Sequence, residues 1–241
     1  MVKAVEIINK DNFILRGFLH LPPHATKIVV MLHGFTGNKT EHNGHFRNLS
    51  RMLEKEGIAS LRMDFHGNGE SDGEFSDFVF ENALDDANRM IKYAKEVEGI
   101  KECYLLGFSM GGAMASLVAN DSIDKLVLWS AAGTMKETAH RSLDGWRKLD
   151  NDHSYSNGFI ISRAYVDSID KYDMYQNCGN FHNPCLIVQG SEDLSVNPKC
   201  AMKYHELIKN SKLHLIEGAG HGYNAYEEAL ELYNVTIDFL K

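Results

Sequence analysis

Short runs of apolar residues recur along the chain, and stretches with helical spacing separate them. The first run, Ile28–Leu32, is apolar on both faces, which is typical of a central strand in a parallel sheet. Similar short runs predict further strands at Ala59–Met63, Cys103–Leu106, Leu126–Trp129, Cys185–Val188 and Lys212–Ile216. Apolar positions at helical spacing predict helices at Phe46–Glu56, Asn82–Val97, Gly111–Asn120, Lys199–Ile208 and Asn224–Leu240.

The order of these elements predicts the fold class. Two strands, Val5–Ile8 and Phe13–Leu19, open the chain, and strand–helix alternation then predicts an α/β fold with a mostly parallel sheet covered on both faces. The stretch from about Gly133 to Asn180 departs from this alternation. A segment this long inside a compact domain is more often a lid or binding insert than a plain loop. We therefore expect a single domain over residues 1–241, with a lid insert at about 133–180.

Composition narrows the classes of partner and compartment. The 241 residues carry a formal net charge of −8, so the basic surface that nucleic-acid binding requires is not expected. Neither a polybasic anchor nor a long apolar run predicts contact with a membrane. No signal peptide is visible, and the four cysteines show neither a CxxC pair nor zinc-ligand spacing. We expect reduced thiols in a cytoplasmic protein.

The strongest chemical signal is the segment Gly107-Phe108-Ser109-Met110-Gly111-Gly112, which joins a predicted strand to a predicted helix. In this context G-x-S-x-G is the nucleophile elbow of α/β-hydrolases. Glycines let the strand and the helix approach closely, and the tight turn holds the serine hydroxyl clear of the sheet. The helix N-terminus offers N–H groups to a developing oxyanion. The alternative, a glycine-rich turn with an incidental serine, is less favoured by this context.

A serine nucleophile needs a base, and in these hydrolases the order along the chain is Ser, acid, His. Asp193 follows the strand Cys185–Val188, and His221 follows the strand Lys212–Ile216. Both therefore lie on the rim of the sheet where Ser109 is expected. Separately, the aspartate could be a turn residue and the histidine a surface residue. Together they predict a Ser109–His221–Asp193 triad, with Glu192 as the rival acid.

A further loop, His33-Gly34-Phe35, follows the first central strand. We predict that the backbone N–H groups of Phe35 and Met110 form the oxyanion hole, and that His33 is a structural residue whose ring joins neighbouring loops. His42 and His45 have no carboxylate or cysteine partner at metal-ligand spacing, so a solvated loop is favoured over a metal site. The glycines after His66 are a weak sign of a phosphate loop, because no GxGxxG or GK[ST] motif is present.

These segments resemble those of bacterial cinnamoyl (feruloyl) esterases of the α/β-hydrolase superfamily. The resemblance rests on Leu32–Asn38, Asp64–Gly73 and Gly107–Gly112, and extends over nearly the whole chain. It implies a serine carboxylesterase that releases hydroxycinnamic acids and whose insert roofs the pocket and binds the aromatic acid. In such relatives an acidic group and a tyrosine can contact the substrate phenol, which suggests Glu137, Tyr155 and Tyr165 here. The residues flanking the serine, often His and Gln in these esterases, are Phe108 and Met110.

We therefore expect hydrolysis of hydroxycinnamate esters through an acyl-enzyme, with neither an organic cofactor nor a metal. A lipase-like esterase acting on short acyl or monoacylglycerol esters is the first alternative, and the Met110 form also occurs in monoacylglycerol lipases. The second is a non-catalytic ligand-binding protein on a hydrolase fold. A peptidase would need carboxylates for an amino terminus, and no clear pair is visible. The only partner expected is a small ester substrate, although the exposed apolar insert could serve as a homodimer face.

Overall fold

A twisted eight-stranded sheet forms the centre of the protein, in a computed structural model that describes the backbone of residues 1–241 and all side chains except those of residues 142–144. The strand order is β1-β2-β4-β3-β5-β6-β10-β11. β2 is antiparallel to both β1 and β4, and the remaining pairs are parallel. The strands are β1 (Val2–Ile8), β2 (Ile14–His20), β3 (Lys27–Leu32), β4 (Ala59–Met63), β5 (Glu102–Phe108), β6 (Lys125–Trp129), β10 (Cys185–Gly190) and β11 (Ser211–Ile216).

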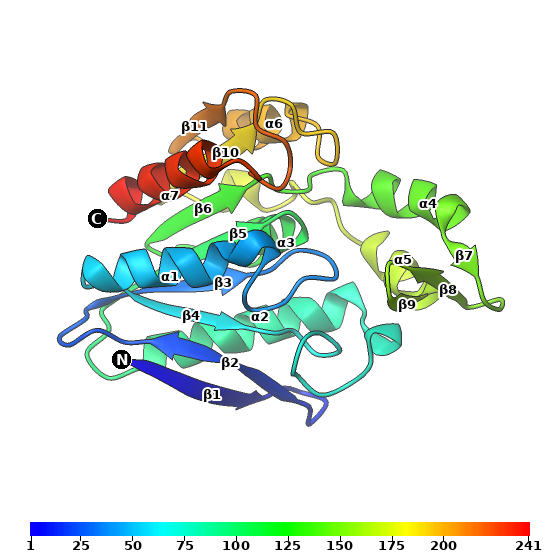
Figure 1. Ribbon diagram of the computed structural model, residues 1–241, viewed down its shortest axis with the longest axis horizontal. Coiled ribbons are helices and arrows are strands. Elements are labelled where there is room, and N and C mark those ends of the chain that lie inside the picture. The colour runs from blue at the N-terminus through cyan, green and yellow to red at the C-terminus, as the bar shows by residue number, and fades with distance from the viewer.

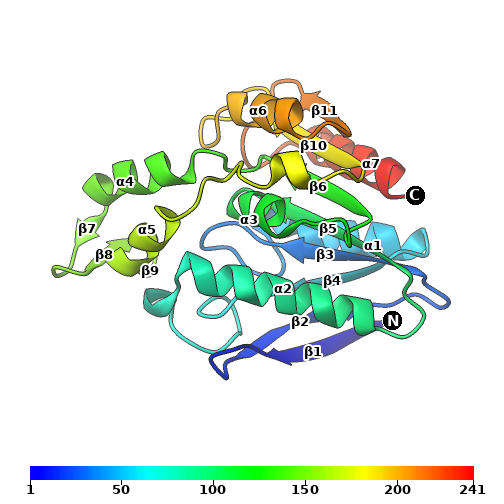
Figure 2. The same ribbon diagram turned by 180° about the vertical axis from the view of Figure 1, so that it is seen from behind.

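Helices cover both faces of the sheet, as Figures 1 and 2 show from opposite sides. One face carries α1 (His45–Lys55) and α7 (Tyr226–Leu240), and the other carries α2 (Phe80–Glu96), α3 (Met110–Val118) and α6 (Lys199–Leu207). Alternate residues of β3 divide between the two cores: Val29 and Met31 pack with α1, whereas Ile28, Val30 and Leu32 lie in the core with α2 and α3. The α/β prediction is confirmed, and the predicted ends agree to within a few residues.

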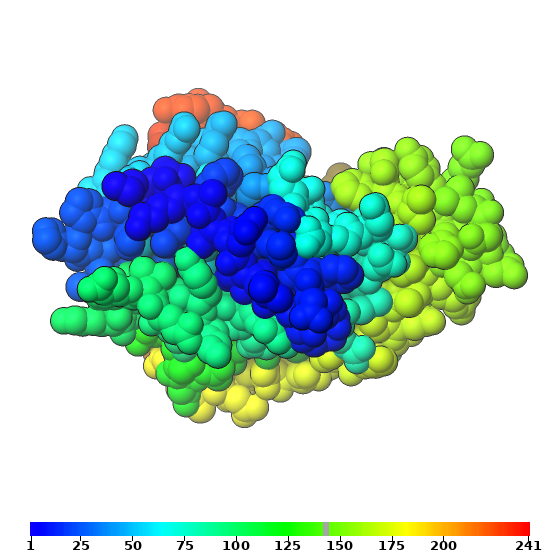
Figure 3. Space-filling view, turned by 90° about the horizontal axis from the view of Figure 1, so that it is seen from below, coloured from blue at the N-terminus to red at the C-terminus, as the bar shows by residue number. Residues whose placement is uncertain are grey.

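The residues between β6 and β10 hold elements that the sequence pattern did not reveal, and we refer to residues 133–180 as the insert. It contains α4 (Met135–Gly145), a small antiparallel sheet and α5 (Arg163–Ile169). The sheet strands are β7 (Arg147–Lys148), β8 (His153–Ser156) and β9 (Phe159–Ser162). The insert, yellow-green in Figure 3, projects at one end of the molecule. The short helices η1 (His42–Gly44), η2 (Phe75–Asp77) and η3 (Cys178–Asn180) complete the chain.

Specific contacts tie the insert to the main sheet layers. The ring of Phe159 on β9 lies 4.8 Å from that of Phe75 on η2, in an edge-to-face arrangement. The hydroxyl of Ser168 on α5 accepts a hydrogen bond of 2.9 Å from the N–H of Phe80, the first residue of α2.

All four cysteines are free and buried, and burial raises the pKa of Cys103 to about 11. Throughout the described part of the chain, no helix is long and apolar enough to cross a membrane.

Candidate active site

The turn between β5 and α3 holds Ser109 in a strained conformation. Its φ of 55° and ψ of −116° lie where non-glycine residues are rare. The turn is tight because β3, β5 and α3 touch through glycines. A Cβ on Gly111 would overlap the carbonyl oxygen of Leu32, and one on Gly107 would overlap that of Gly111. The glycine spacing in the sequence therefore has a direct steric cause.

Three side chains from separate strand ends form a continuous hydrogen-bonded relay. The Oγ atom of Ser109 lies 3.0 Å from Nε2 of His221, whose Nδ1 lies 2.7 Å from Oδ2 of Asp193. These residues follow β5, β11 and β10, so parallel pairing in the sheet brings together positions that are far apart in sequence. The imidazole is partly exposed, and the ring of Phe108 packs against it at a centroid distance of 5.0 Å.

The Asp193 carboxylate is buried and fully hydrogen-bonded. Oδ1 accepts from the N–H groups of Ser195 and Val196, at 2.9 and 2.8 Å, and Oδ2 accepts from the Gln189 amide at 2.8 Å as well as from His221. Burial raises the pKa of this carboxyl, but the contacts with His221 and the other donors outweigh burial and lower the pKa below its usual value. The rival acid, Glu192, is exposed to solvent.

Two backbone N–H groups beside Ser109 are available for a ligand. Phe35 and Met110 line one cavity together with Ser109, and among the described residues neither N–H has an acceptor. His33, just before this loop, is completely buried. Its Nε2 accepts from the Phe65 N–H at 3.2 Å, so its Nδ1 carries the proton and donates to the Gly34 carbonyl at 2.9 Å. The prediction that His33 joins neighbouring loops is confirmed.

An apolar pocket and a more polar cleft meet at Ser109. The cavity has a volume of about 150 Å³, and its wall is mainly apolar, with the side chains of Phe35, Trp146 and Tyr165. The Phe35 ring stacks on Tyr165 at 4.9 Å and lies 6.3 Å from Trp146. On the other side, a cleft of about 440 Å³ is lined by polar residues that include Thr36, Asn38, His42 and Asn224. Ser109 thus lies between an aromatic pocket and a polar groove.

Comparison with known families agrees with this geometry. A family model described as "Serine aminopeptidase, S33" matches residues 23–149, which is more than half of the chain. The chain belongs to this α/β-hydrolase family. Its eight-stranded sheet and flanking helices are those of the α/β-hydrolase fold.

Three similar proteins align with most of this chain. The structure described as ferulic acid bound to Est1E from Butyrivibrio proteoclasticus is 27% identical, has a TM-score of 0.89, and overlaps 98% of each chain. The human serine hydrolase BPHL is 27% identical and covers 88% of this chain and 79% of its own. A 2-hydroxy-6-oxo-6-(2'-aminophenyl)hexa-2,4-dienoic acid hydrolase of Metapseudomonas resinovorans is 24% identical and covers 88% of this chain and 83% of its own.

The residues suggested for substrate binding divide into two groups. Tyr165 lines the aromatic pocket, and its hydroxyl lies 3.9 Å from the Met110 sulfur. Glu137 instead lines a separate cavity, because on α4 the positions that face the pocket are Met135, Thr138 and Ala139. At 100° per residue Glu137 falls on another side of the helix. Tyr155 lies exposed on β8 and does not line the pocket. The structure therefore places neither Glu137 nor Tyr155 in the lining of this pocket.

Sequence reasoning missed several residues around the site. Gln189 is buried on β10, and its amide donates to Asp193. Its position at the end of a predicted strand, just before Gly190, was the one signal in the sequence for a role near the site. Glu41 is also buried, and its carboxylate accepts from the N–H of Gly34 at 2.7 Å. The pocket wall from α4 was missed because no helix was predicted there. A helical pattern of apolar residues in the insert would have been needed to predict this part of the wall.

His45 lies in a buried contact rather than in the solvated loop that we predicted. It is 2% exposed, and it binds both Tyr233 and the backbone of Gly222, whereas His42 is exposed. Neither histidine belongs to a group of three or more potential metal ligands within the described part of the chain.

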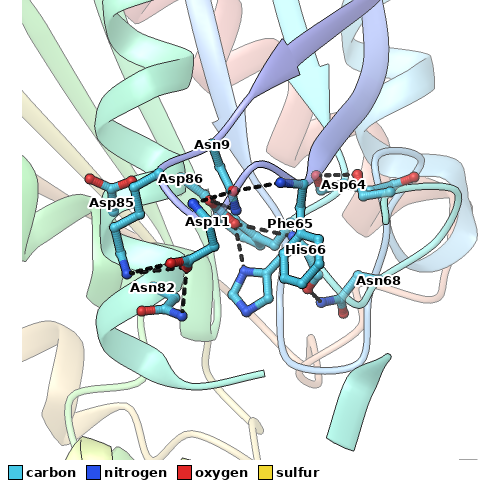
Figure 4. Close-up of polar contacts among 12 residues, drawn as sticks. Asn9, Asp11, Asp64, Phe65, His66, Asn68, Asn82, Asp85 and Asp86 are labelled. Atoms are coloured by element: carbon cyan, nitrogen blue, oxygen red, sulfur yellow. Dashed lines mark hydrogen bonds and ion pairs between the residues drawn. The ribbon is translucent and has the colours of Figure 1, made fainter. Parts of the chain in front are cut away.

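The glycine loop after β4 is fixed by its own backbone and by a buried carboxylate. The N–H of Gly67 donates to the carbonyl of Asp72 at 2.8 Å, so this amide is not free for a phosphate. Asp86 of α2 accepts from Nδ1 of His66 at 2.7 Å and from the Asn9 side chain at 2.9 Å, as Figure 4 shows. Contacts within the protein therefore hold this loop in place.

Proposed function

We propose that the protein is a serine carboxylesterase that hydrolyses hydroxycinnamate-type esters through an acyl-enzyme on Ser109. The observation that carries this proposal is the hydrogen-bonded chain from Ser109 through His221 to Asp193, placed beside two unoccupied N–H groups. A strained serine next to a base, with donors for an oxyanion, matches the requirements for acyl transfer.

Each group has a defined role in this mechanism. His221 accepts the Ser109 proton as Oγ forms a bond to the ester carbonyl carbon, and Asp193 holds the imidazole in the required tautomer and stabilises its charge. The N–H groups of Phe35 and Met110 bind the tetrahedral oxyanion. The C–O bond of the ester then breaks, His221 protonates the departing alcohol, and an acyl group remains on Ser109. Water repeats the sequence and releases the acid.

The shape of the aromatic pocket supports a compact, flat acyl group. Phe35, Tyr165 and Trp146 provide ring faces, and Met135 and Ala139 provide apolar contacts from α4. The structural relative with ferulic acid bound supports the same class of acid. The aromatic lining of the pocket suits a flat ring, which favours this class of acid over the lipase-like alternative. Its described lining also contains no carboxylate for the amino terminus of a peptide.

The nucleophile is tested by the hydrolysis of 4-nitrophenyl acetate and methyl ferulate by wild type and by Ser109→Ala. Loss of the hydroxyl removes the acyl-enzyme pathway, so we expect kcat to fall by at least about 10³-fold with both substrates. Circular dichroism and a thermal melt check that the variant remains folded. Full activity in folded Ser109→Ala would contradict the mechanism.

The substrate class is tested by narrowing the pocket. Ala139→Leu adds bulk from α4 to the pocket wall, so we expect kcat/KM for methyl ferulate to fall at least about tenfold while the value for 4-nitrophenyl acetate changes less than about threefold. A monoacylglycerol and an aminoacyl 4-nitroanilide complete the panel with wild type. Faster hydrolysis of either of these than of methyl ferulate would refute the proposed specificity while leaving the serine mechanism intact.

A further inference from the structure

We propose that Glu41 is a positioning residue, which aligns the N–H of Phe35 for the oxyanion by fixing the backbone of Gly34. This inference rests on the proposed function. It starts from the flexibility of the loop: the peptide that carries the Phe35 N–H is preceded by a glycine, the residue with the greatest backbone freedom. Gly34 also lies directly against the nucleophile, since a Cβ there would be 3.4 Å from Cβ of Ser109. An external anchor is therefore required to hold its orientation.

Hydrogen bonds from within the loop hold the two peptide groups that flank Gly34. The Glu41 carboxylate accepts from the Gly34 N–H at 2.7 Å, which restrains the first group. The Gly34 carbonyl accepts from His33 Nδ1 at 2.9 Å and from the Gly37 N–H at 3.0 Å, which restrains the second. Because the peptide is trans, the N–H of Phe35 points opposite to this anchored carbonyl.

Glu41 itself is held in place by its surroundings. The residue is 9% exposed, and its second carboxylate oxygen accepts from the His42 N–H at 2.8 Å. The backbone has a φ of 61°, and it is fixed by hydrogen bonds from its own N–H to Asn38 and from the Gly44 N–H to its carbonyl. A strained, buried residue with both carboxylate oxygens committed to backbone N–H groups forms a rigid clamp.

A negative charge near a developing oxyanion is unfavourable, so electrostatics alone do not explain this residue. Glu41 contributes by placing a hydrogen-bond acceptor beside the buried N–H of Gly34. Without this acceptor the N–H has no partner, and the peptide groups around Gly34 can rotate. The side chain does not touch the reacting atoms, because its described contacts are to the backbone of residues 34 and 42. Loss of Glu41 should therefore weaken transition-state binding more than substrate binding.

The experiment compares wild type with Glu41→Ala, Glu41→Gln and Glu41→Asp, and Glu98→Ala serves as a control at an exposed glutamate. Active sites are counted with a fluorophosphonate, and kcat and KM for 4-nitrophenyl acetate are expressed per active site. Phenylboronic acid is the second probe, because its tetrahedral adduct on serine places an oxygen in the oxyanion hole. A residue that only stabilises the fold would lower the melting temperature and the number of active sites without changing either kcat per site or the boronate Ki.

We expect Glu41→Ala to lower kcat about 10²-fold, to raise the boronate Ki in parallel and to change KM less than about threefold. Glu41→Gln keeps one acceptor oxygen but sets an NH2 group against one of the two backbone N–H donors, so its kcat should lie between those of wild type and Glu41→Ala. If Glu41→Ala does not fold, Glu41→Asp carries the test: its shorter side chain cannot reach Gly34, so kcat should fall at least about tenfold.

Wild-type kcat and Ki in Glu41→Ala, or in Glu41→Asp if Glu41→Ala is unfolded, would overturn the inference. The proposed function is judged separately by Ser109→Ala in the same assay. If that variant is inactive while the Glu41 variants keep full kcat, only the positioning role fails. If folded Ser109→Ala stays active, the proposed function itself fails.

Discussion

The Nε2 atom of His45 lies 2.8 Å from the carbonyl oxygen of Gly222, the residue that follows His221. The other ring nitrogen, Nδ1, lies 2.6 Å from the hydroxyl of Tyr233 on α7. Because the carbonyl can only accept, Nε2 carries the proton and Nδ1 accepts from the tyrosine. The first residue of α1 thus connects α7 to the loop that supplies the proposed catalytic base.

His45→Phe should lower both stability and activity. The ring volume is largely kept, but the Gly222 carbonyl and the Tyr233 hydroxyl lose a buried partner, at a cost of about 1–3 kcal/mol for each group left without one. Movement of the His221 loop should also reduce kcat. Urea unfolding and ester hydrolysis measure the two effects. Adding Tyr233→Phe removes the hydroxyl that has lost its partner, so the double variant should regain stability but not kcat. Recovery of both stability and kcat would show that His45 does not position the His221 loop.

Stability should fall as the pH is lowered from 7.5 to 5.5. Burial is the main cause that lowers the pKa of His33 and His45, so both stay neutral in the folded protein while the unfolded chain takes up protons below about pH 6.5. The unfolded state then binds more protons, and the unfolding free energy decreases by roughly 1–2 kcal/mol over this range. Urea unfolding of wild type and His45→Phe at each pH is the measurement. The variant should show a shallower dependence, and equal slopes would contradict the role assigned to His45.

The glycine at the elbow should be irreplaceable for a steric reason. In Gly111→Ala the new Cβ would overlap the backbone of Leu32, which cannot move without separating β3 from α3. We expect destabilisation by about 3 kcal/mol or more, or failure to fold. Gly179→Ala is the matched control, because a Cβ there meets nothing within 4 Å and the position does not have a positive φ. Similar melting temperatures for the two variants would contradict this account.

The parts of the fold that follow from local patterns were predictable from the sequence. Apolar runs gave the strands of the main sheet, and the known order of elements placed Ser109, Asp193 and His221 at one edge of that sheet. Their mutual distances depend on packing that no single segment encodes. The insert could not be predicted in this way. The apolar and polar residues of α4 and β8 show only weak periodicity, so the sequence does not indicate which of their residues face the pocket.

Side chains that act at a distance along the chain were equally hard to predict. Glu41 has a φ of 61° and binds the backbone of Gly34, seven residues earlier, and an isolated glutamate in a polar stretch gives no sign of this. His45 is buried because α7, at the other end of the sequence, packs beside α1. Such contacts arise from the tertiary arrangement and not from the spacing of residues within one segment.

The identity of the acidic partner can be decided by a matched pair of amides. Asp193→Asn replaces the carboxylate that orients His221, and its amide group would favour the wrong tautomer, so kcat should fall by about 10³–10⁴-fold. Glu192→Gln changes the neighbouring, solvent-exposed carboxylate and should leave kcat within about twofold. Hydrolysis of 4-nitrophenyl acetate at pH 7.5 compares the two variants. A large loss in Glu192→Gln together with an active Asp193→Asn would transfer the acid role to the exposed residue, which could reach His221 only if the loop after β10 rearranged.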